Sequence, residues 1–318
     1  MRVMRRRLAF GGRLLLMGAC IAVLSTFARP RPAGELTNNA WEKAAGGKMA
    51  FEVASVKPSE PGRGYENFPL TLGANFAKVG NLMSVDLPLR PLIGFAYKLS
   101  MGQMNFYISG LPDWVGAEWF DIEARAPISD PTKDQFRLMV QSLLADRFKL
   151  ATHEEKREAP IYALVLTKSG RTGPQLRPHV DDAKCGAEGQ ADAPPASGQF
   201  ADLPCGATIM GMSHVPGRVR GGGRDVDLNY ISAFLTGTGF RGTAPDRPVV
   251  NETGLTGDYD FSIEFSPDAN ALLNGVPPDP NGPSFPEALA DQLGLKLKAE
   301  KGMIDVLVVD HIEKPTPN

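Results

Sequence analysis

Val85-Asp86-Leu87 and Phe120-Asp121-Ile122-Glu123 recur later in the chain as Val226-Asp227-Leu228 and Phe261-Ser262-Ile263-Glu264. Both pairs are separated by 141 residues. Two further pairs of similar segments follow in the same order, 145 and 143 residues apart: 144–146 with 289–291, and 161–166 with 304–309. Matches that follow the same order and are separated by nearly the same number of residues indicate an internal repeat. The sequence therefore predicts two tandem copies of one structural unit.

Each copy has the pattern of a β-α-β-α-β-β unit. The helix after the Val-Asp-Leu strand is expected at 88–99 in the first copy and at 229–236 in the second. The next strand is expected at 120–124 and at 259–265. The second helix of the first copy shows the i, i+3, i+4, i+7 spacing of one buried face, carried by Phe136, Met139, Val140 and Leu143.

The ends of these elements also carry recognisable signals. Asp130-Pro131 suits the N-cap and first position of the helix that contains Phe136. Ser284 and Glu287 have the spacing of a capping box before a helix at 288–293. Each copy is expected to close with two strands joined by a charged turn. His153-Glu154-Glu155 falls at such a turn, and it lacks the second histidine of a helical zinc-protease motif.

The predicted fold class is α+β. Each of the two tandem copies is expected to hold a mainly antiparallel or mixed sheet with helices on one face, and a strand at 51–56 precedes the first copy. The predicted division of the chain is a signal peptide, a flexible segment, a first α/β unit, a Gly/Pro/Ala-rich linker and a second α/β unit, at 1–28, 29–50, 51–168, 169–212 and 213–318.

The first 28 residues predict export. Five arginines and no acidic residue precede or enter a short apolar run, and small residues follow it near Ala28, as in a secretory signal peptide. The remaining chain would carry 29 Lys and Arg against 36 Asp and Glu, or a net charge of about −7. This acidic balance argues against nucleic acid as a partner. No second apolar run of membrane length follows, so the expected location is the periplasm or the extracellular space.

The cysteines agree with export. Cys185 and Cys205 are predicted to form a disulfide across a Gly-, Ala- and Pro-rich loop. Cys20 lies within Met17-Gly18-Ala19-Cys20, which either belongs to an ordinary signal sequence or is a lipobox whose cysteine is acylated. A metal site would need four ligands at short spacing, and only His179 and His214 lie near the cysteine pair. No metal and no cofactor is expected.

The sharpest local signature is the stretch from Arg247 to Phe261. Within it, Thr253 and the two carboxylates Asp258 and Asp260 flank glycine turns. These three residues, with Trp114 at the corresponding place in the first copy, are the candidate ligand-binding residues. The alternative is a structural turn that leads into a strand.

No catalytic residue is predicted. Gly211-Met212-Ser213-His214 lacks the closing glycine of a nucleophile elbow. Gly221-Gly222-Gly223 lacks the lysine of a phosphate-binding loop and is expected to form a flexible turn.

Several segments together resemble one known family. They are residues 51–58, 144–150, 248–261, 292–297 and 313–315. The family is an uncharacterised group of exported acidobacterial proteins, a domain of unknown function with many paralogues per genome, and the resemblance spans about residues 51–318. It implies no catalytic or binding residue. Some relatives resemble the outer segment of membrane peptidases of the beta-lactam-sensor type, which implies extracytoplasmic sensing only by fold-level association.

The function expected from these features is a non-catalytic extracytoplasmic binding or sensing module. Its partner would be an envelope ligand or protein, bound near the place where the two copies meet. A structural or assembly protein of the cell envelope is the alternative, and an enzyme of unrecognised type is the third class. A pocket between the copies would favour binding, and a perturbed acid or base in a cleft would favour an enzyme.

Overall fold

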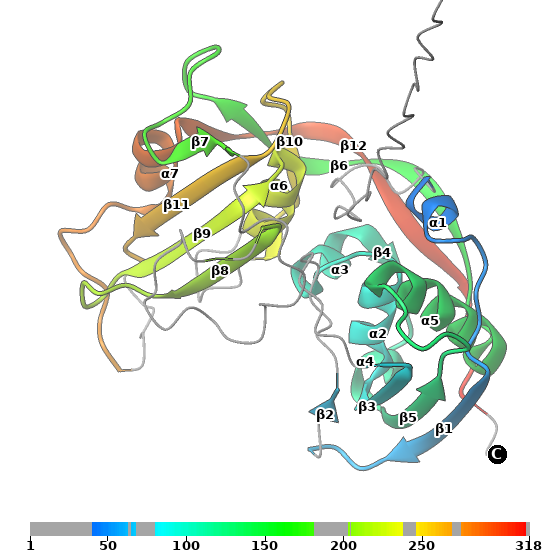
Figure 1. Ribbon diagram of the computed structural model, residues 1–318. Helices are drawn as coiled ribbons and strands as arrows, with labels where there is room; N and C mark the ends of the chain where they lie inside the picture. Colours follow the sequence, from blue (N-terminus) through cyan, green and yellow to red (C-terminus); the bar gives the residue numbers. More distant parts are fainter. Residues whose placement is uncertain are drawn as a thin grey trace, which may run out of the picture.

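The computed structural model of the 318-residue chain describes residues 40–62, 65–67, 80–180, 203, 205–237, 246–268 and 275–315. The predicted signal peptide, with Cys20, lies outside the described residues, as does Cys185. Two lobes are joined by a long two-stranded ribbon (Figure 1). Among the described residues, no helix is both long and apolar enough to span a membrane.

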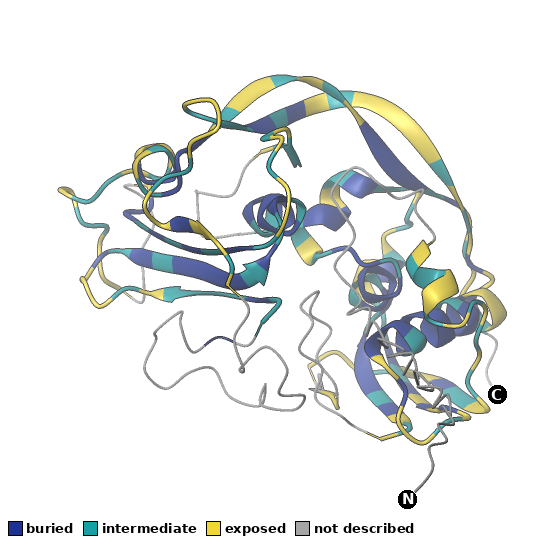
Figure 2. Cartoon of the chain, turned by 45° about the horizontal axis from the view of Figure 1, so that its top comes forward, coloured by how far each residue is buried: buried dark blue, intermediate teal, exposed yellow. Residues whose placement is uncertain are grey.

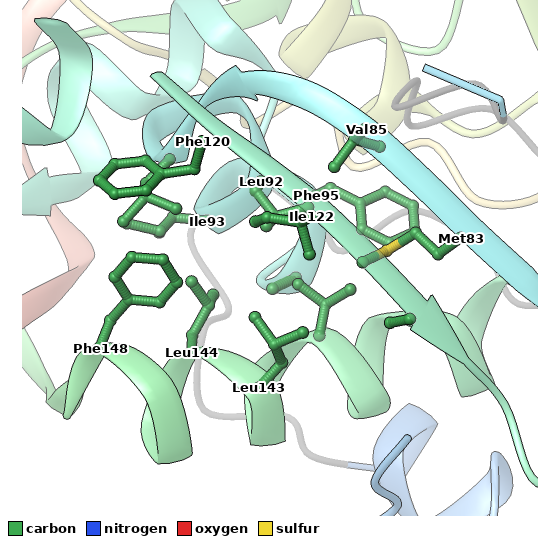
Figure 3. Close-up of a cluster of buried hydrophobic side chains, with 14 of the residues drawn as sticks. Met83, Val85, Leu92, Ile93, Phe95, Phe120, Ile122, Leu143, Leu144 and Phe148 are labelled. Carbon is green, nitrogen blue, oxygen red and sulfur yellow. The ribbon is translucent and has the colours of Figure 1, made fainter. Parts of the chain in front are cut away.

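The first lobe is a four-stranded antiparallel sheet in the order β1-β5-β3-β2. Its strands are β1 (Val53–Ser59), β2 (Tyr65–Glu66), β3 (Leu82–Pro88) and β5 (Trp119–Arg125). Helices α2 (Leu89–Ala96) and α5 (Lys133–Phe148) pack their apolar side chains on this sheet (Figure 3). The rings of Phe120 and Phe148 meet edge to face, with centroids 5.2 Å apart, so strand β5 and the end of α5 are locked together.

The second lobe has a four-stranded antiparallel sheet in the order β7-β11-β9-β8. Its strands are β7 (Leu176–Pro178), β8 (Ala207–Met212), β9 (Val219–Val226) and β11 (Tyr259–Phe265), and its helices are α6 (Leu228–Gly237) and α7 (Phe285–Leu293). Alternate residues of β11 are buried, from Tyr259 to Phe265, as expected for a strand with one face on the core. β7 and β8 lie within residues 169–212, for which the composition predicts a linker.

The third sheet belongs to both lobes. β6 (Ala151–Leu166) and β12 (Leu295–His311) pair antiparallel along nearly their whole length. β10 (Val249–Asn251), from the second lobe, runs parallel to β6, and β4 (Ile108–Ser109), from the first lobe, runs parallel to β12. Figure 2 shows the ribbon as an arch over both lobes, with many exposed residues along it.

The predicted terminal hairpins are wrong, because each is one continuous strand. The charged residues that suggest turns instead form cross-strand pairs on the ribbon. Lys301 Nζ lies 3.0 Å from Glu158 Oε1, and both side chains are exposed. His153 likewise lies within β6, opposite Val308. The middle of each strand is exposed to solvent and rich in charged residues, so its composition resembles that of a turn although the chain stays extended.

The glycine run Gly221-Gly222-Gly223 is also not a turn but the middle of β9. A Cβ atom at Gly223 would lie 2.6 Å from Cε1 of Phe261, and one at Gly221 would lie 2.7 Å from Sδ of Met210. These glycines leave room for large side chains from the neighbouring strands.

Other predictions fare better. The mixed α+β class is confirmed, with sheets that are mostly antiparallel, and the helix and strand positions predicted inside each copy match α2, α6, β5 and β11. The capping box of Ser284 and Glu287 is confirmed at the start of α7. The N-cap of α5 is Thr132, not Asp130, because Thr132 and Gln135 form a reciprocal capping box.

Some of the described helices lie outside the predicted pattern: α1 (Ala40–Ala44), α3 (Met101–Tyr107) and α4 (Trp114–Ala117). α3 begins with a capping box formed by Ser100 and Gln103, and it packs against α6 of the other lobe. At this contact Gly102 lies against Gly237, and a Cβ atom at Gly102 would be 2.4 Å from Cα of Gly237 and 2.8 Å from the Thr236 carbonyl oxygen. The lobes approach this closely only because both positions are glycine.

Gly102→Ala is therefore expected to destabilise the protein by about 1–3 kcal/mol, because backbone atoms of α6 must move to admit the methyl group. Gly116→Ala in α4 is the matched control, since the nearest atom to its new Cβ would be 4.0 Å away. The control is expected to be neutral or to gain up to about 1 kcal/mol from helix propensity. Urea unfolding measures both, and an equal response of the two variants would contradict the tight contact.

Candidate functional site

A buried ionic cluster lies where α2 ends and α5 begins. Lys98 Nζ is 3.0 Å from Asp134 Oδ2, and Arg137 Nη1 donates to the other oxygen of the same carboxylate. Arg137 Nε also donates to the carbonyl oxygen of Phe95, at 3.2 Å. Lys98, Asp134 and Arg137 are each less than 5% exposed, so the ion pairs are almost fully removed from water.

Lys133 adds a third basic side chain to this cluster. It is 7% exposed, and burial lowers its pKa to about 6, with repulsion from Arg137 and Lys98 acting in the same direction and Asp134 opposing them. Burial likewise lowers the pKa of Arg137, which Asp134 partly offsets. A lysine with a pKa so far below its ordinary value marks a place where charge is costly.

The cluster faces the junction of the lobes. Arg137 lies close enough to Tyr230 of α6 to lower the pKa of the phenol, although burial raises that pKa more strongly. On another side, the Trp41 ring of α1 covers Lys98, with Nζ 4.2 Å from the ring centroid. The indole nitrogen of Trp41 is buried without a hydrogen-bond partner among the described residues.

The composition of this site favours an anion. Among the described side chains of the cluster, Lys98 and Arg137 are cationic, Lys133 is a base that becomes charged only below about pH 6, and Asp134 is a carboxylate. Lys133 is the first residue of α5, so the positive end of a 16-residue helix adds to the positive potential. Thr132, immediately before it, is exposed, and the start of α5 is therefore the side of the cluster nearest to solvent.

The sequence interpretation missed this site. Lys133 and Arg137 are four residues apart, which is typical of the polar, solvent-facing side of an amphipathic helix. The one local signal for an ion pair is the i, i+3 spacing of Asp134 and Arg137. Nothing in the sequence indicates that Lys98 lies beside this pair.

The predicted candidates lie elsewhere, and the structure gives them different roles. Thr253 closes a turn, because its hydroxyl donates to Asn251 Oδ1 at 2.8 Å and accepts from the Leu255 backbone N–H at 3.1 Å. Trp114 packs edge to face on Phe120 at the first core, with ring centroids 6.3 Å apart.

Asp258 and Asp260 both contact His179 of the segment that follows β7. The backbone N–H of His179 donates to the Asp258 carbonyl oxygen at 2.8 Å, and its Nδ1 is 2.7 Å from Asp260 Oδ1. The same Asp260 oxygen accepts the backbone N–H of Asp225 at 2.9 Å. Asp225 has a positive φ of 53°, at the irregular register between β9 and β11, and this bend brings its carboxylate to 4.0 Å from His179 Nε2.

Cys205 completes this second cluster. Its Sγ and the ligand atoms of His179 and Asp225 all lie within 4.8 Å of one another. Cys205 is disulfide-bonded. Its predicted partner, Cys185, lies outside the described residues, so the pairing of these two cysteines stays a prediction.

The sequence pairs that resemble hydrolase motifs do not become catalytic dyads. Ser213 Oγ donates to Glu264 Oε2 at 2.6 Å, so this hydroxyl is bound to a carboxylate on β11. His153 Nδ1 contacts Asp310 at 2.8 Å on the exposed ribbon.

Lys133→Met tests the cost of the buried amine. Since the pKa of Lys133 is about 6 in the folded protein and near 10.5 when unfolded, the unfolded state binds more protons between these values and stability falls as pH drops from 10 to 6. Lys133→Met is expected to gain roughly 3 kcal/mol at pH 7 and less toward pH 10. Denaturant unfolding across this range measures the difference, with exposed Lys301→Met expected within about 0.5 kcal/mol of wild type. A pH-independent difference for Lys133→Met would refute the assignment.

Comparison with known proteins places the chain in one family. Neither the curated proteins nor the solved structures contain a significant match. The family described as "Protein of unknown function (DUF3738)" matches residues 90–312, a stretch that includes α5 with its ionic cluster and most of the second lobe. Since this match covers well over half of the chain, the protein belongs to the DUF3738 family.

Proposed function

We propose that the protein is an exported, non-catalytic binding or sensing module that takes a small acidic ligand at the cluster of Lys98, Lys133 and Arg137. The observation that carries this proposal is the burial of three basic side chains, at the junction of the lobes, around the single carboxylate that the described residues place there. A buried charge that lowers stability is rarely kept unless it serves function, and groups with strongly shifted pKa values concentrate at functional sites.

The position of the cluster also supports sensing. A ligand held by α5 would lie beside the contact between α3 and α6, where the lobes approach closely. A ligand that changes the electrostatic environment of Arg137 would be felt at Tyr230 of the second lobe. Ligand binding can therefore bias how the lobes pack, which is what a sensor requires.

The two lobes are further proposed to be copies of one unit. The strand orders β1-β5-β3-β2 and β7-β11-β9-β8 correspond position by position, and β4 and β10 hold equivalent places beside β12 and β6. In each copy the terminal pair of strands is replaced by one long strand of the ribbon, which both copies share.

Binding of an acidic ligand is expected to depend on pH. A bound anion favours the charged amine of Lys133, whose pKa is about 6 in the free protein. Above pH 6 the protein must take up a proton on binding, so the affinity is expected to fall by up to about tenfold per pH unit.

The test is a thermal-shift titration at pH 6 and pH 8 with inorganic phosphate, succinate and citrate, and with neutral trehalose as the control. At least one acid is expected to stabilise the protein, by about 2.7 kcal/mol at a hundredfold excess over Kd, and more strongly at pH 6. Lys133→Met should abolish this effect and Lys301→Met should keep it. The proposal fails if no acid stabilises the protein, or if Lys133→Met responds like wild type.

Export has its own test. Intact mass of the protein recovered from a bacterial periplasm is expected to correspond to a mature chain that starts after Ala28, lighter by two hydrogens if Cys185 and Cys205 are joined. A mass that retains the first 28 residues would contradict cleavage, and a lipid-modified chain starting at Cys20 would establish the lipoprotein alternative.

A further inference from the structure

Strand β8 forms one edge of the second lobe's sheet. It pairs with β9 on one side, and no strand of the described residues pairs with its other side (Figure 1). Just after β8, the Ser213 N–H donates to the Arg218 carbonyl oxygen of the β9 side at 3.0 Å. Backbone groups alternate in direction along a strand, so the odd-numbered residues of β8 face β9. Thr208, Met210 and Met212 therefore turn their N–H and C=O groups outward.

This edge lacks the features that protect sheet edges from pairing with another chain. Natural edge strands carry charged residues or proline, or are very short. β1 contains Lys57 and Pro58, and the free stretches of β6 and β12 are rich in charged residues. β2, β4, β7 and β10 have only two or three residues. Among the described edge strands of more than three residues, β8 alone has neither a charge nor a proline in its six residues.

The edge is also firmly held and bordered by apolar side chains. Before β8, Cys205 is disulfide-bonded, and the Gly206 N–H donates to the Arg224 carbonyl oxygen at 2.9 Å. At the other end, the side chains of Met212 and Val215 are 44% and 39% exposed. A strand that is already fixed loses little conformational entropy when another strand pairs with it. Covering the exposed apolar side chains would add to the stability of such a pair.

A second copy of the chain fits this edge by symmetry. Two β8 strands can pair antiparallel about a two-fold axis at Met210, so that Met210 faces its own copy and Thr208 faces Met212 of the other copy. Every residue with outward backbone groups then lies in a hydrogen-bonded pair, and the exposed Met212 is covered on both copies. Like charges directly opposite each other would oppose self-pairing, and β8 contains no charged residue.

We propose that the protein forms a two-fold symmetric dimer by antiparallel pairing of β8 with β8 of a second copy. The pairing joins two four-stranded sheets into one sheet of eight strands. A single strand pair buries less than the roughly 1,200 Å² of a standard interface, so the dimer is expected to be weak, with a Kd of about 10–100 µM. This surface belongs to the second lobe, and the inference is independent of the acidic-ligand site on α5.

Sedimentation velocity of the purified full chain, from about 1 µM to about 500 µM, measures the association. Wild type is expected to pass from monomer to dimer across this range. Met212→Lys places a charge on the edge strand and should raise Kd at least about tenfold. Met303→Lys is the matched control, because Met303 is a 57% exposed methionine on the ribbon, and it should dimerise like wild type.

Amide hydrogen exchange identifies the strand that pairs. The N–H groups of Thr208, Met210 and Met212 should exchange quickly in the monomer and become protected in the dimer. Thermal unfolding checks that each variant folds. Met212→Pro is the second variant, since a proline is tolerated on an edge strand where the N–H faces outward, and it should also block the dimer.

The proposal is overturned if wild type stays monomeric throughout this concentration range. It is equally overturned if the folded Met212 variants dimerise with wild-type affinity, or if dimer formation leaves the exchange of the three outward N–H groups unchanged.

Discussion

The pairing of β6 with β12 is the constraint on which the rest of the molecule depends. The register runs from Leu166 opposite Leu295 to Ala151 opposite His311. At one end Leu164 and Leu295 enter the core of the second lobe, and at the other end Val309 enters the core of the first. Between them, Ile161 and other ribbon residues cover α3 in a third, smaller core. Neither lobe is therefore complete without a strand that also serves the other lobe.

This shared ribbon fixes how the lobes meet. Because β4 leads out of α3 and pairs with β12, α3 is held under the arch and against α6. The same arrangement brings α5, with Arg137 at its buried face, close to Tyr230. The ribbon thus holds α6, with Tyr230, beside an ionic cluster whose own ion pairs lie within the first lobe.

The sequence predicted those parts of the fold that local patterns determine. β11 follows from its alternating apolar residues, and α7 follows from its capping box. The ribbon could not be predicted, because Glu158 and Lys301 give strand residues the composition of turns, and only pairing between distant segments keeps them extended. The site near Asp260 was half predicted: the carboxylate is in a recognisable turn motif, but His179 reaches it only through the pairing of β7 with β11.

The ionic clusters of the two lobes differ in composition. Among the described residues around Asp134, basic side chains outnumber acids, so a bound anion would stabilise this cluster. The burial of these charges already costs desolvation free energy in the folded protein, and a bound anion would offset part of that cost. Among the described residues around His179, the acids Asp225 and Asp260 exceed the bases. The two lobes thus present ionic clusters of different composition near their sheets. A ligand at the cluster of α5 would act across the contact between α3 and α6, and this position is why we propose the sensing function for α5.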